Sequence, residues 1–364
     1  MMGKDTITFM GVGDIIIDRE KPETIFQYVE DTLRSADITY ANCDQAYADK
    51  GTPNPKQASY STSKNIPALL HTGIDAVSLA NNHSLDWGVE GILETMENLA
   101  KAGLPYVGTG RNLVEARKPV ILERKGIKVG LLAYSSVHLD GYEATEDRPG
   151  LVPIRVRTIY EQVDYQPGTP PKIITIAYKE DLTAMIDDIK KLKAQVDVVI
   201  VYYHWGIHLL PRVIPMYCFE LGHEAIDAGA DLIIGTHAHL LKGIEMYKGK
   251  AIFYSLGNFA LELGKHMRDH EHVRELDEHY RSFEWTERMK TMIAKAVIED
   301  GKITRVSYIP GYINENSEPM ITKRGEPKGQ EVFDYVKDIS RSEGLSVRFS
   351  WDGDSEVLIT PATD

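Results

Sequence analysis

Short apolar segments rich in Ile and Val alternate along the chain with amphipathic segments of helix length. This alternation is typical of βα units that build a largely parallel sheet. The predicted strands are Ile7–Val12, Asp37–Ala41, Ala76–Ala80, Val120–Glu123, Lys128–Tyr134, Val196–Tyr203 and Asp231–Ile234. The predicted helices are Thr24–Arg34, Val89–Ala102, Leu182–Ala194 and Met216–Ala228. Because the stretch Val198–Val201 is apolar throughout, we expect a sheet that is covered on both faces.

Two segments interrupt this pattern and are predicted to be insertions. Residues 138–172 are rich in Pro, Gly and charge and predict a long loop or lid, whereas residues 264–290 are strongly charged and predict an amphipathic surface helix. The dipeptide Asp300-Gly301 separates two further apolar stretches and predicts a β-hairpin. We expect one domain over residues 5–313 and a C-terminal extension, residues 314–364, packed on it; a helix at 330–340 and a strand at 347–351 are predicted there.

The charge and composition narrow the class of protein. The 364 residues include 41 Lys+Arg and 54 Asp+Glu, which gives a formal net charge of −13. An acidic chain is unfavourable for binding nucleic acid or an anionic membrane surface. Two cysteines cannot form a disulfide framework, and no apolar segment approaches the roughly 20 residues of a transmembrane helix. With no signal-peptide pattern at its start, the chain is expected to be cytoplasmic.

Five of the predicted strands are followed directly by residues of the metal-ligand type. Binding sites in open α/β sheets form at the carboxyl ends of the strands, so we expect these side chains to converge. Two carboxylates brought together and buried would repel each other, and one or two divalent cations would remove that cost. Carboxylate oxygen with imidazole nitrogen suits Mn, Fe or Zn. The residues are Asp14, Asn42, Asp44, Asn82, His83, His204, His237 and His239.

Each of these residues also has a simpler interpretation when taken alone. Asp14 and Asp44 are typical of turns and helix caps at strand ends. Asn82 suits a tight turn, and His204 suits a half-buried, hydrogen-bonded histidine. The metal-site prediction rests on the joint pattern, because packing alone would require five independent coincidences.

Four stretches resemble one known family, the CapA-type proteins of poly-γ-glutamate capsule synthesis. They are residues 78–121, which contain SLANNHSLDWGVEG, 203–211 (YHWGIHLLP), 229–245 (GADLIIGTHAHLLKGIE) and 254–261 (YSLGNFAL). The resemblance covers about residues 5–262. It implies the fold of the calcineurin-like metallophosphoesterases, a four-layer α/β/β/α sandwich with a two-metal centre.

The resemblance also implies roles for individual residues. Asp14 and His239 match ligands of the first metal, Asp44 matches the bridging carboxylate, and Asn82, His204 and His237 match ligands of the second metal. His83 matches the histidine that protonates a leaving group, with Asp86 orienting it. Three departures are visible: Ile16 replaces the histidine that phosphoesterases carry in the first motif, Asp44 replaces a glutamate, and His208 replaces a glutamate after HWG-x. The centre is therefore expected to hold one or two ions.

The resulting hypothesis is a metal-dependent, hydrolase-like enzyme in which His83 acts as general acid or base. Its substrate would be a small molecule or peptide: an amide, γ-glutamyl or peptide compound, or a phosphoester. The alternatives are metal-assisted epimerisation of a peptide and a non-catalytic accessory or binding role in poly-γ-glutamate synthesis; a homo-oligomer is left open. The residues expected on the substrate side are Asn42, Trp205, His208, Ser255 and Asn258.

Overall fold

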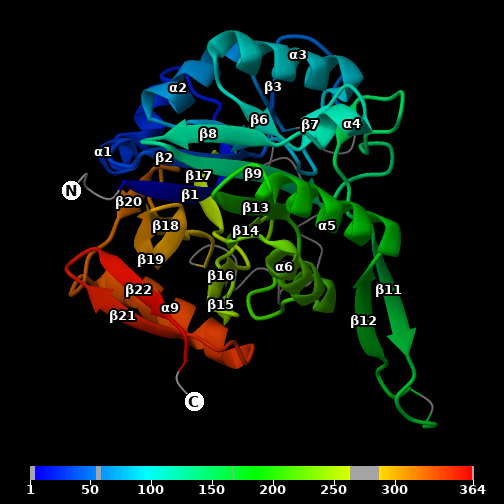
Figure 1. Ribbon diagram of the computed structural model, residues 1–364, viewed down its shortest axis with the longest axis vertical. Helices are drawn as coiled ribbons and strands as arrows, with labels where there is room; N and C mark the ends of the chain where they lie inside the picture. Colours follow the sequence, from blue (N-terminus) through cyan, green and yellow to red (C-terminus); the bar gives the residue numbers. More distant parts are fainter. Residues whose placement is uncertain (1–4, 55–58, 167, 263–286, 363–364) are drawn as a thin grey trace.

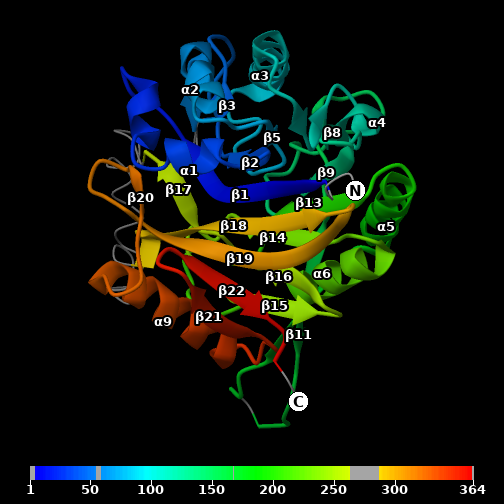
Figure 2. The same cartoon turned by 60° about the vertical axis from the view of Figure 1, so that its left-hand side comes forward.

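The computed structural model describes residues 5–54, 59–166, 168–262 and 287–362 of the chain. Within these residues, one sheet of ten strands lies against a second sheet of six strands, with helices on both sides (Figures 1 and 2). The α/β class predicted from the sequence is confirmed.

The ten-stranded sheet has the order β21-β22-β19-β18-β1-β2-β5-β6, with β17 beside β1 and β20 beside β19. Its parallel part is formed by β1, β2, β5, β6 and β17, and the C-terminal strands extend it in antiparallel fashion. The bounds are β1 (Thr6–Ile16), β2 (Ile38–Cys43), β5 (Ala76–Ser78), β6 (Tyr106–Val107), β17 (Asn258–Leu261), β18 (Lys290–Glu299), β19 (Lys302–Ile313), β20 (Pro319–Ile321), β21 (Arg348–Asp352) and β22 (Glu356–Thr360).

The six-stranded sheet has the order β15-β16-β14-β13-β9-β8. Its four central strands are parallel, and the two edge strands run antiparallel to their neighbours. All seven residues of β13 are buried, as expected for a central strand covered on both faces. The bounds are β8 (Val120–Arg124), β9 (Ile127–Ser135), β13 (Val198–His204), β14 (Leu232–Thr236), β15 (Ile244–Tyr247) and β16 (Lys250–Phe253).

Three buried hydrophobic clusters show how the layers pack. Alternate side chains of β13 point to opposite sides: Ile200 and Tyr202 join the cluster between the two sheets, whereas Val201 and Tyr203 join the cluster under α5 and α6. A third cluster lies between the ten-stranded sheet and α2 and α3. The two sheets therefore pack against each other, with α5 and α6 on the outer face of one, α2 and α3 on the outer face of the other, and α9 at the cluster between them. The helices are η1 (Pro22–Phe26), α1 (Glu30–Arg34), η2 (Ser63–Asn65), α2 (Ile66–His71), α3 (Gly88–Ala102), α4 (Leu113–Ala116), α5 (Lys179–Lys193), α6 (Met216–Ala228) and α9 (Pro327–Ser342).

The single helix predicted over residues 24–34 is wrong. The structure has the 3₁₀ turn η1 and the short helix α1 instead, separated by residues 27–29. The apolar positions Ile25, Phe26, Val29 and Leu33 still reach one core cluster. Packing therefore fixes the segment, although its backbone does not form one continuous helix.

The predicted C-terminal hairpin is confirmed as β18 and β19. Asp300 and Gly301 both have positive φ, 50° and 74°, which is the conformation that a tight hairpin turn requires. The strand β22 was not predicted; with β21 it adds the last two strands to the ten-stranded sheet. The helix predicted over 264–290 falls mainly on 263–286, outside the described residues.

The predicted insertion 138–172 contains more regular structure than a loop. Three two-stranded sheets complete the described structure, and two of them involve this segment: β3 (Ala46–Tyr47) with β4 (Tyr60–Ser61), β7 (Thr109–Gly110) with β10 (Gly150–Leu151), and β11 (Val156–Glu161) with β12 (Lys172–Ala177). The β11–β12 hairpin extends away from the body of the molecule (Figure 1). No helix in the described part of the chain is long and apolar enough to cross a membrane.

Candidate metal centre

The ends of β1, β2, β13 and β14 and the turn after β5 bring the predicted ligand-type residues to one place. The tightest group is Asp14, Asp44 and His204, each of which offers one ligand atom within 4.8 Å of the others. All three side chains are buried. The two sheets contribute from opposite sides. Asp14 lies on β1 and Asp44 directly follows β2 of the ten-stranded sheet, whereas His204 ends β13 of the other.

Glycines allow the strands to approach closely enough to form the centre. A Cβ on Gly13, next to Asp14, would lie 2.0 Å from the carbonyl oxygen of Gly257, so only glycine fits there. The same approach lets the Asp14 N–H donate to that carbonyl at 3.1 Å. Asp14 is thereby fixed between Asn42 on β2 and Asn258 on β17, its register partners in the sheet.

Asp14 is held by amide and backbone donors. Asn42 Nδ2 donates to Asp14 Oδ1 at 2.7 Å, and the backbone N–H of His237 donates to Asp14 Oδ2 at 3.2 Å. His239 Nδ1 lies 3.4 Å from Oδ2. Burial, together with the nearby charge of Asp44, nevertheless raises the pKa of Asp14 well above its usual value.

Asp44 is a buried carboxylate that lacks hydrogen-bond donors among the described residues. Both of its carboxylate oxygens are buried, and neither has a hydrogen-bond partner among the described residues. The nearest basic atoms are His204 Nε2 at 3.6 Å and His239 Nε2 at 3.8 Å, beyond normal hydrogen-bond length. Burial and the charge of Asp86 raise its pKa to about 6. A buried carboxylate without donors is costly, and a bound cation would satisfy both oxygens. The residues present therefore fit a divalent metal.

Three imidazoles face these carboxylates in the form that binds metals. His204 Nε2 lies 2.7 Å from Asn82 Oδ1 and 3.2 Å from His237 Nδ1. His239 Nδ1 lies 2.7 Å from Asn258 Oδ1. Burial, and then the proximity of further imidazoles, lowers the pKa of His204, His237 and His239 well below its usual value. All three are therefore neutral at pH 7, as a metal ligand must be.

His237 and His239 both occupy the left-handed region of backbone space. Their φ angles are 86° and 52°, where residues other than glycine are uncommon. The intervening Ala238 is buried. Such strain clusters at functional sites, where the surrounding structure holds it in place. The turn after β14 therefore keeps a strained backbone that directs two imidazoles to the centre.

Comparison with known proteins assigns most of the chain to one family. Residues 6–262 match the family described as bacterial capsule synthesis protein PGA_cap, and they include every residue of the centre. The chain belongs to the PGA_cap family.

The individual proteins to which this chain is similar share about a third of their residues with it or fewer. This PGA_cap chain is 31% identical over 272 residues to the PGA biosynthesis protein CapA of Bacillus subtilis (strain 168), covering 71% of this chain and 64% of that protein. It is 25% identical over 350 residues to the capsule biosynthesis protein CapA of Bacillus anthracis, covering 93% of this chain and 74% of that one. The calcineurin-like phosphoesterase YfkN from Bacillus subtilis aligns with 93% of this chain and 98% of its own, at 13% identity and a TM-score of 0.43.

A second group of polar residues in the PGA_cap chain surrounds His83. Its Nδ1 lies 2.6 Å from Asp86 Oδ2, and Tyr142 donates its hydroxyl to Asp86 Oδ1 at 3.0 Å. Asn54 donates to that hydroxyl at 3.0 Å. Burial alone would lower the pKa of His83, but the carboxylates of Asp44 and Asp86 raise it to about 9. His83 therefore differs in charge from the other histidines of the centre.

Three residues of this network, Asn54, Tyr142 and Asn81, were not predicted from the sequence. Tyr142 lies in the predicted insertion 138–172. It contacts Asp86 although the two residues are 56 positions apart, so no local sequence pattern indicates the contact. Asn81 precedes the predicted ligand Asn82, and a tight turn is its simplest interpretation from the sequence. Its Nδ2 donates to the Cys43 carbonyl at 2.6 Å, and its Oδ1 accepts the His83 N–H at 3.0 Å. It thus joins the end of β2 to the turn that carries His83.

The residues predicted to contact substrate fall into different environments. His208 is exposed, and its ring lies 5.3 Å from that of His237 and 5.0 Å from that of His239, centroid to centroid. Asn258 is buried against His239. Asn42 is also buried, and its amide is used by Asp14 and Asn81. Of the five predicted substrate contacts, only His208 is exposed.

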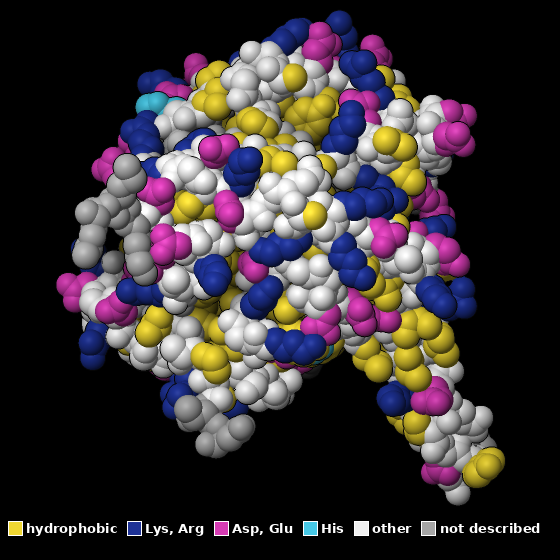
Figure 3. All heavy atoms as spheres, in the orientation of Figure 1, with side chains coloured by type: hydrophobic (Ala, Val, Ile, Leu, Met, Phe, Trp, Pro, Cys, Tyr) yellow, Lys and Arg dark blue, Asp and Glu magenta, His cyan; other side chains and the backbone are white. Residues whose placement is uncertain are grey.

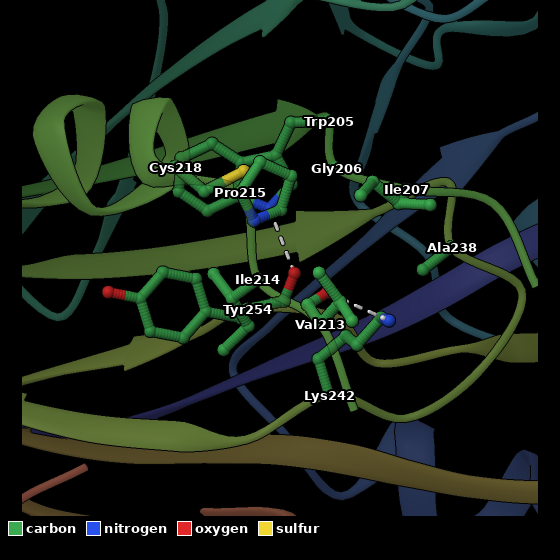
Figure 4. A pocket seen from close by; sticks show the side chains of 10 residues that line it. All are labelled: Trp205, Gly206, Ile207, Val213, Ile214, Pro215, Cys218, Ala238, Lys242 and Tyr254. Carbon is green, nitrogen blue, oxygen red and sulfur yellow. Dashed lines mark hydrogen bonds between the residues drawn. The ribbon is translucent and has the colours of Figure 1, made fainter. Parts of the chain in front are cut away.

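Trp205 and Ser255 are both buried, and each is hydrogen-bonded within the fold. The Trp205 ring stacks on Tyr203 at 4.4 Å and donates its N–H to the Tyr254 carbonyl at 2.8 Å. Figure 4 shows it lining a cavity behind the loop that follows β13; at about 10 Å³ this cavity holds no more than one water. The Ser255 hydroxyl accepts the N–H of Gly257 at 3.1 Å within a buried turn. Both side chains are buried, and their contacts with a substrate stay predictions.

Lys242 secures the loop that carries His208. Lys242 is buried beside the same cavity, and its ammonium group donates to the carbonyls of Leu210 and Pro211. It also donates to the carbonyl of Val213 at 3.1 Å (Figure 4). These bonds satisfy a buried cation with carbonyl oxygens rather than with a carboxylate. The loop beside the centre is therefore anchored from within the fold.

Proposed function

We propose that this PGA_cap protein is a metal-dependent hydrolase. The proposed ligands for one or two divalent cations, Mn, Fe or Zn, are Asp14, Asp44, Asn82, His204, His237 and His239. The observation that carries the proposal is Asp44, whose two buried oxygens have no donor among the described residues while neutral imidazoles face them. A divalent cation held there supplies Lewis-acid polarisation of the scissile group and a more acidic water.

His83 is the proposed general acid or base. Its Nδ1 is bound to Asp86, and Tyr142 fixes the other oxygen of that carboxylate. This leaves Nε2 as the nitrogen that exchanges a proton with the reactants. With a pKa raised to about 9, His83 is protonated at neutral pH and suited to donate to a leaving group.

His208 is the proposed contact on the substrate side, because it alone among the predicted substrate contacts is exposed there. The relatives carry the names PGA biosynthesis protein and capsule biosynthesis protein. We therefore propose an amide or γ-glutamyl compound as the substrate, with a phosphoester as the competing class. Because the chain spans 64% of the Bacillus subtilis relative, activities of that whole protein enter here only as proposals.

Calorimetric titration with Mn²⁺ and Zn²⁺, after removal of all metal by a chelator, tests the centre. We expect binding at one or two sites in the native chain and its loss in Asp44→Asn. Absence of binding by the native chain would refute the metal centre.

Reaction in heavy-oxygen water tests the chemistry. Hydrolysis of a γ-glutamyl amide or of a phosphoester adds one labelled oxygen to the product. Epimerisation moves only a proton, so its product contains no oxygen label. Metal binding without turnover of either substrate class would favour the accessory role.

A further inference from the structure

The β11–β12 hairpin is a projecting arm with an unusually apolar surface. Ile159, Tyr160 and Ile173 are 39%, 68% and 56% exposed, and Tyr165 near the tip is 99% exposed. Figure 3 shows hydrophobic side chains along the arm, clear of the body. A two-stranded hairpin is marginally stable alone in water. The arm thus offers surface that a partner would bury.

One strand of the arm is anchored and the other is open. Ala177 of β12 donates its N–H to Glu220 of α6 at 2.9 Å, and the N–H of Tyr217, also on α6, donates to Thr175 Oγ1 at 3.2 Å. Among the described residues, β11 pairs with β12 and with no other strand. Figure 1 shows β11 on the side of the arm that faces away from α6. The outer edge of β11 is therefore available for pairing.

The hydrogen bonding at the base of the arm identifies the groups on that edge. Tyr178 donates its N–H to the carbonyl of Arg155 at 2.9 Å. In an antiparallel ladder such bonds recur at every second residue, so Arg157, Ile159 and Glu161 bond toward β12. Thr158 and Tyr160 then direct their backbone N–H and C=O groups outward.

The open edge is complementary to itself. When β11 lies antiparallel to β11 of a second copy with Ile159 at the two-fold axis, Thr158 faces Tyr160 of the second copy. These are the residues whose backbone groups point outward, so each pair can exchange two hydrogen bonds. In the same register Arg157 faces Glu161 of the second copy, twice by symmetry. Backbone pairing and charge pairing thus favour one register.

The side chains of this register also match. Ile159 is paired with Ile174 within the arm, so the joined sheet has four isoleucines in one row across its strands. The described residues of the hairpin, 156–166 and 168–177, carry two cations, Arg157 and Lys172, and two anions, Glu161 and Asp164. The whole chain has a net charge of −13. Two copies that associate through this neutral arm would therefore repel each other less than two copies that associate through the acidic body.

We propose that β11 joins two copies of this chain into a two-fold dimer with a four-stranded antiparallel sheet. The arm points away from the body, and antiparallel pairing places the two bodies at opposite ends of that sheet. The interface is independent of the metal centre.

Sedimentation velocity of the full chain tests the dimer. Ile159→Lys places two ammonium groups together at the axis, and we expect the dissociation constant of the dimer to rise at least tenfold. Tyr165→Lys adds the same charge beyond the paired residues and should leave the dimer intact. A monomeric native chain, or equal effects of the two variants, would overturn the proposal. Ile159 is partly exposed on the arm, so we expect Ile159→Lys to leave the body of the protein folded. An unchanged melting temperature of the variant checks this.

Disulfide trapping tests the register. The two native cysteines, Cys43 and Cys218, are buried, so an added thiol on the arm is the reactive one. Ile159→Cys should give a covalent dimer under mild oxidation, because residue 159 faces its own copy at a separation that a disulfide spans. Ile176→Cys lies on β12, one strand further from the axis, and should remain monomeric. Trapping through residue 176 instead of 159 would contradict the proposed edge.

Discussion

The two sheets supply opposite sides of the candidate centre, and burial acts on their charges in opposite directions. On the side of the ten-stranded sheet it raises the pKa of Asp14 and Asp44, and on the other side it lowers the pKa of His204 and His239. Each side is therefore driven toward its neutral form. A cation placed between them would favour the ionised carboxylates and use the neutral imidazoles, so the difference between the sides describes a site built for a positive ion.

His83 departs from this division. It lies on the carboxylate side, and its pKa is raised rather than lowered. The same field that would attract a cation keeps this imidazole protonated. The comparison thus separates histidines suited to bind a metal from one suited to transfer a proton.

Replacing His83 should have the largest effect on turnover. We expect His83→Ala to lower kcat by about 10²–10⁴-fold, the usual contribution of a general acid or base, and to change the Mn²⁺ dissociation constant by less than about threefold. Steady-state kinetics on a chromogenic γ-glutamyl anilide and calorimetry provide the two measurements. His71→Ala, an exposed histidine on α2, is the control. Loss of metal binding in His83→Ala would place His83 among the ligands instead.

Replacing Asp44 should act on the metal. Asp44→Asn keeps the shape but removes the charge, and we expect the dissociation constant for Mn²⁺ to rise by about 100-fold or more, since even indirect partners of a metal contribute 10–100-fold. Calorimetry measures it, with the exposed Asp18→Asn as the control. Unchanged affinity would mean that Asp44 is not a ligand.

Removing the Tyr142 hydroxyl should give a smaller loss. Tyr142→Phe deletes one hydrogen bond to Asp86, worth about 1 kcal/mol, so we expect kcat to fall about fivefold. If Tyr142 acts by positioning His83, the same change in a His83→Ala background should have no further effect. An equal loss in both backgrounds would show that the effect is structural.

The smallest effect concerns the stability of the metal-free protein. The pKa of Asp44 is about 6 in the folded chain against an ordinary 3.8, so the folded chain binds this proton more tightly than the unfolded one. Its contribution to stability is therefore lost as the pH rises from about 4 to about 6. Asp44→Asn should melt roughly 2–4 °C above the native chain at pH 7 and together with it near pH 4. Scanning calorimetry with chelator present measures this, and a difference independent of pH would contradict the assignment.

Much of this arrangement follows from strand periodicity and from the residues that end each strand. The parallel strands could be predicted because their apolar segments are continuous. Asp14 and Asp44 could be predicted to lie together because parallel strands of one sheet end at one edge, whereas His204 joins them from the second sheet. Their roles as ligands stay predictions. The alternation of side chains also accounts for Trp205: it follows His204 directly, and its ring packs in the cluster under α5 and α6.

Other features depend on contacts that no local pattern records. Tyr142 reaches Asp86 because β10 pairs with β7 and returns the insertion to the centre. The split of residues 24–34 into η1 and α1 is set by packing on the core rather than by helix propensity. Strand β22 exists because β19 offers it an edge. Each of these is a tertiary effect, and periodicity reports only local ones.

The left-handed backbone at His237 and His239 has a consequence for how such a protein can change. Each conformation costs of order 1–3 kcal/mol that glycine would largely avoid. If the two imidazoles bound nothing, no interaction would compensate for this loss of stability. Selection for heat resistance alone would therefore favour glycine at both positions, and retention of the two imidazoles in descendants of this chain would record continued demand for what they hold.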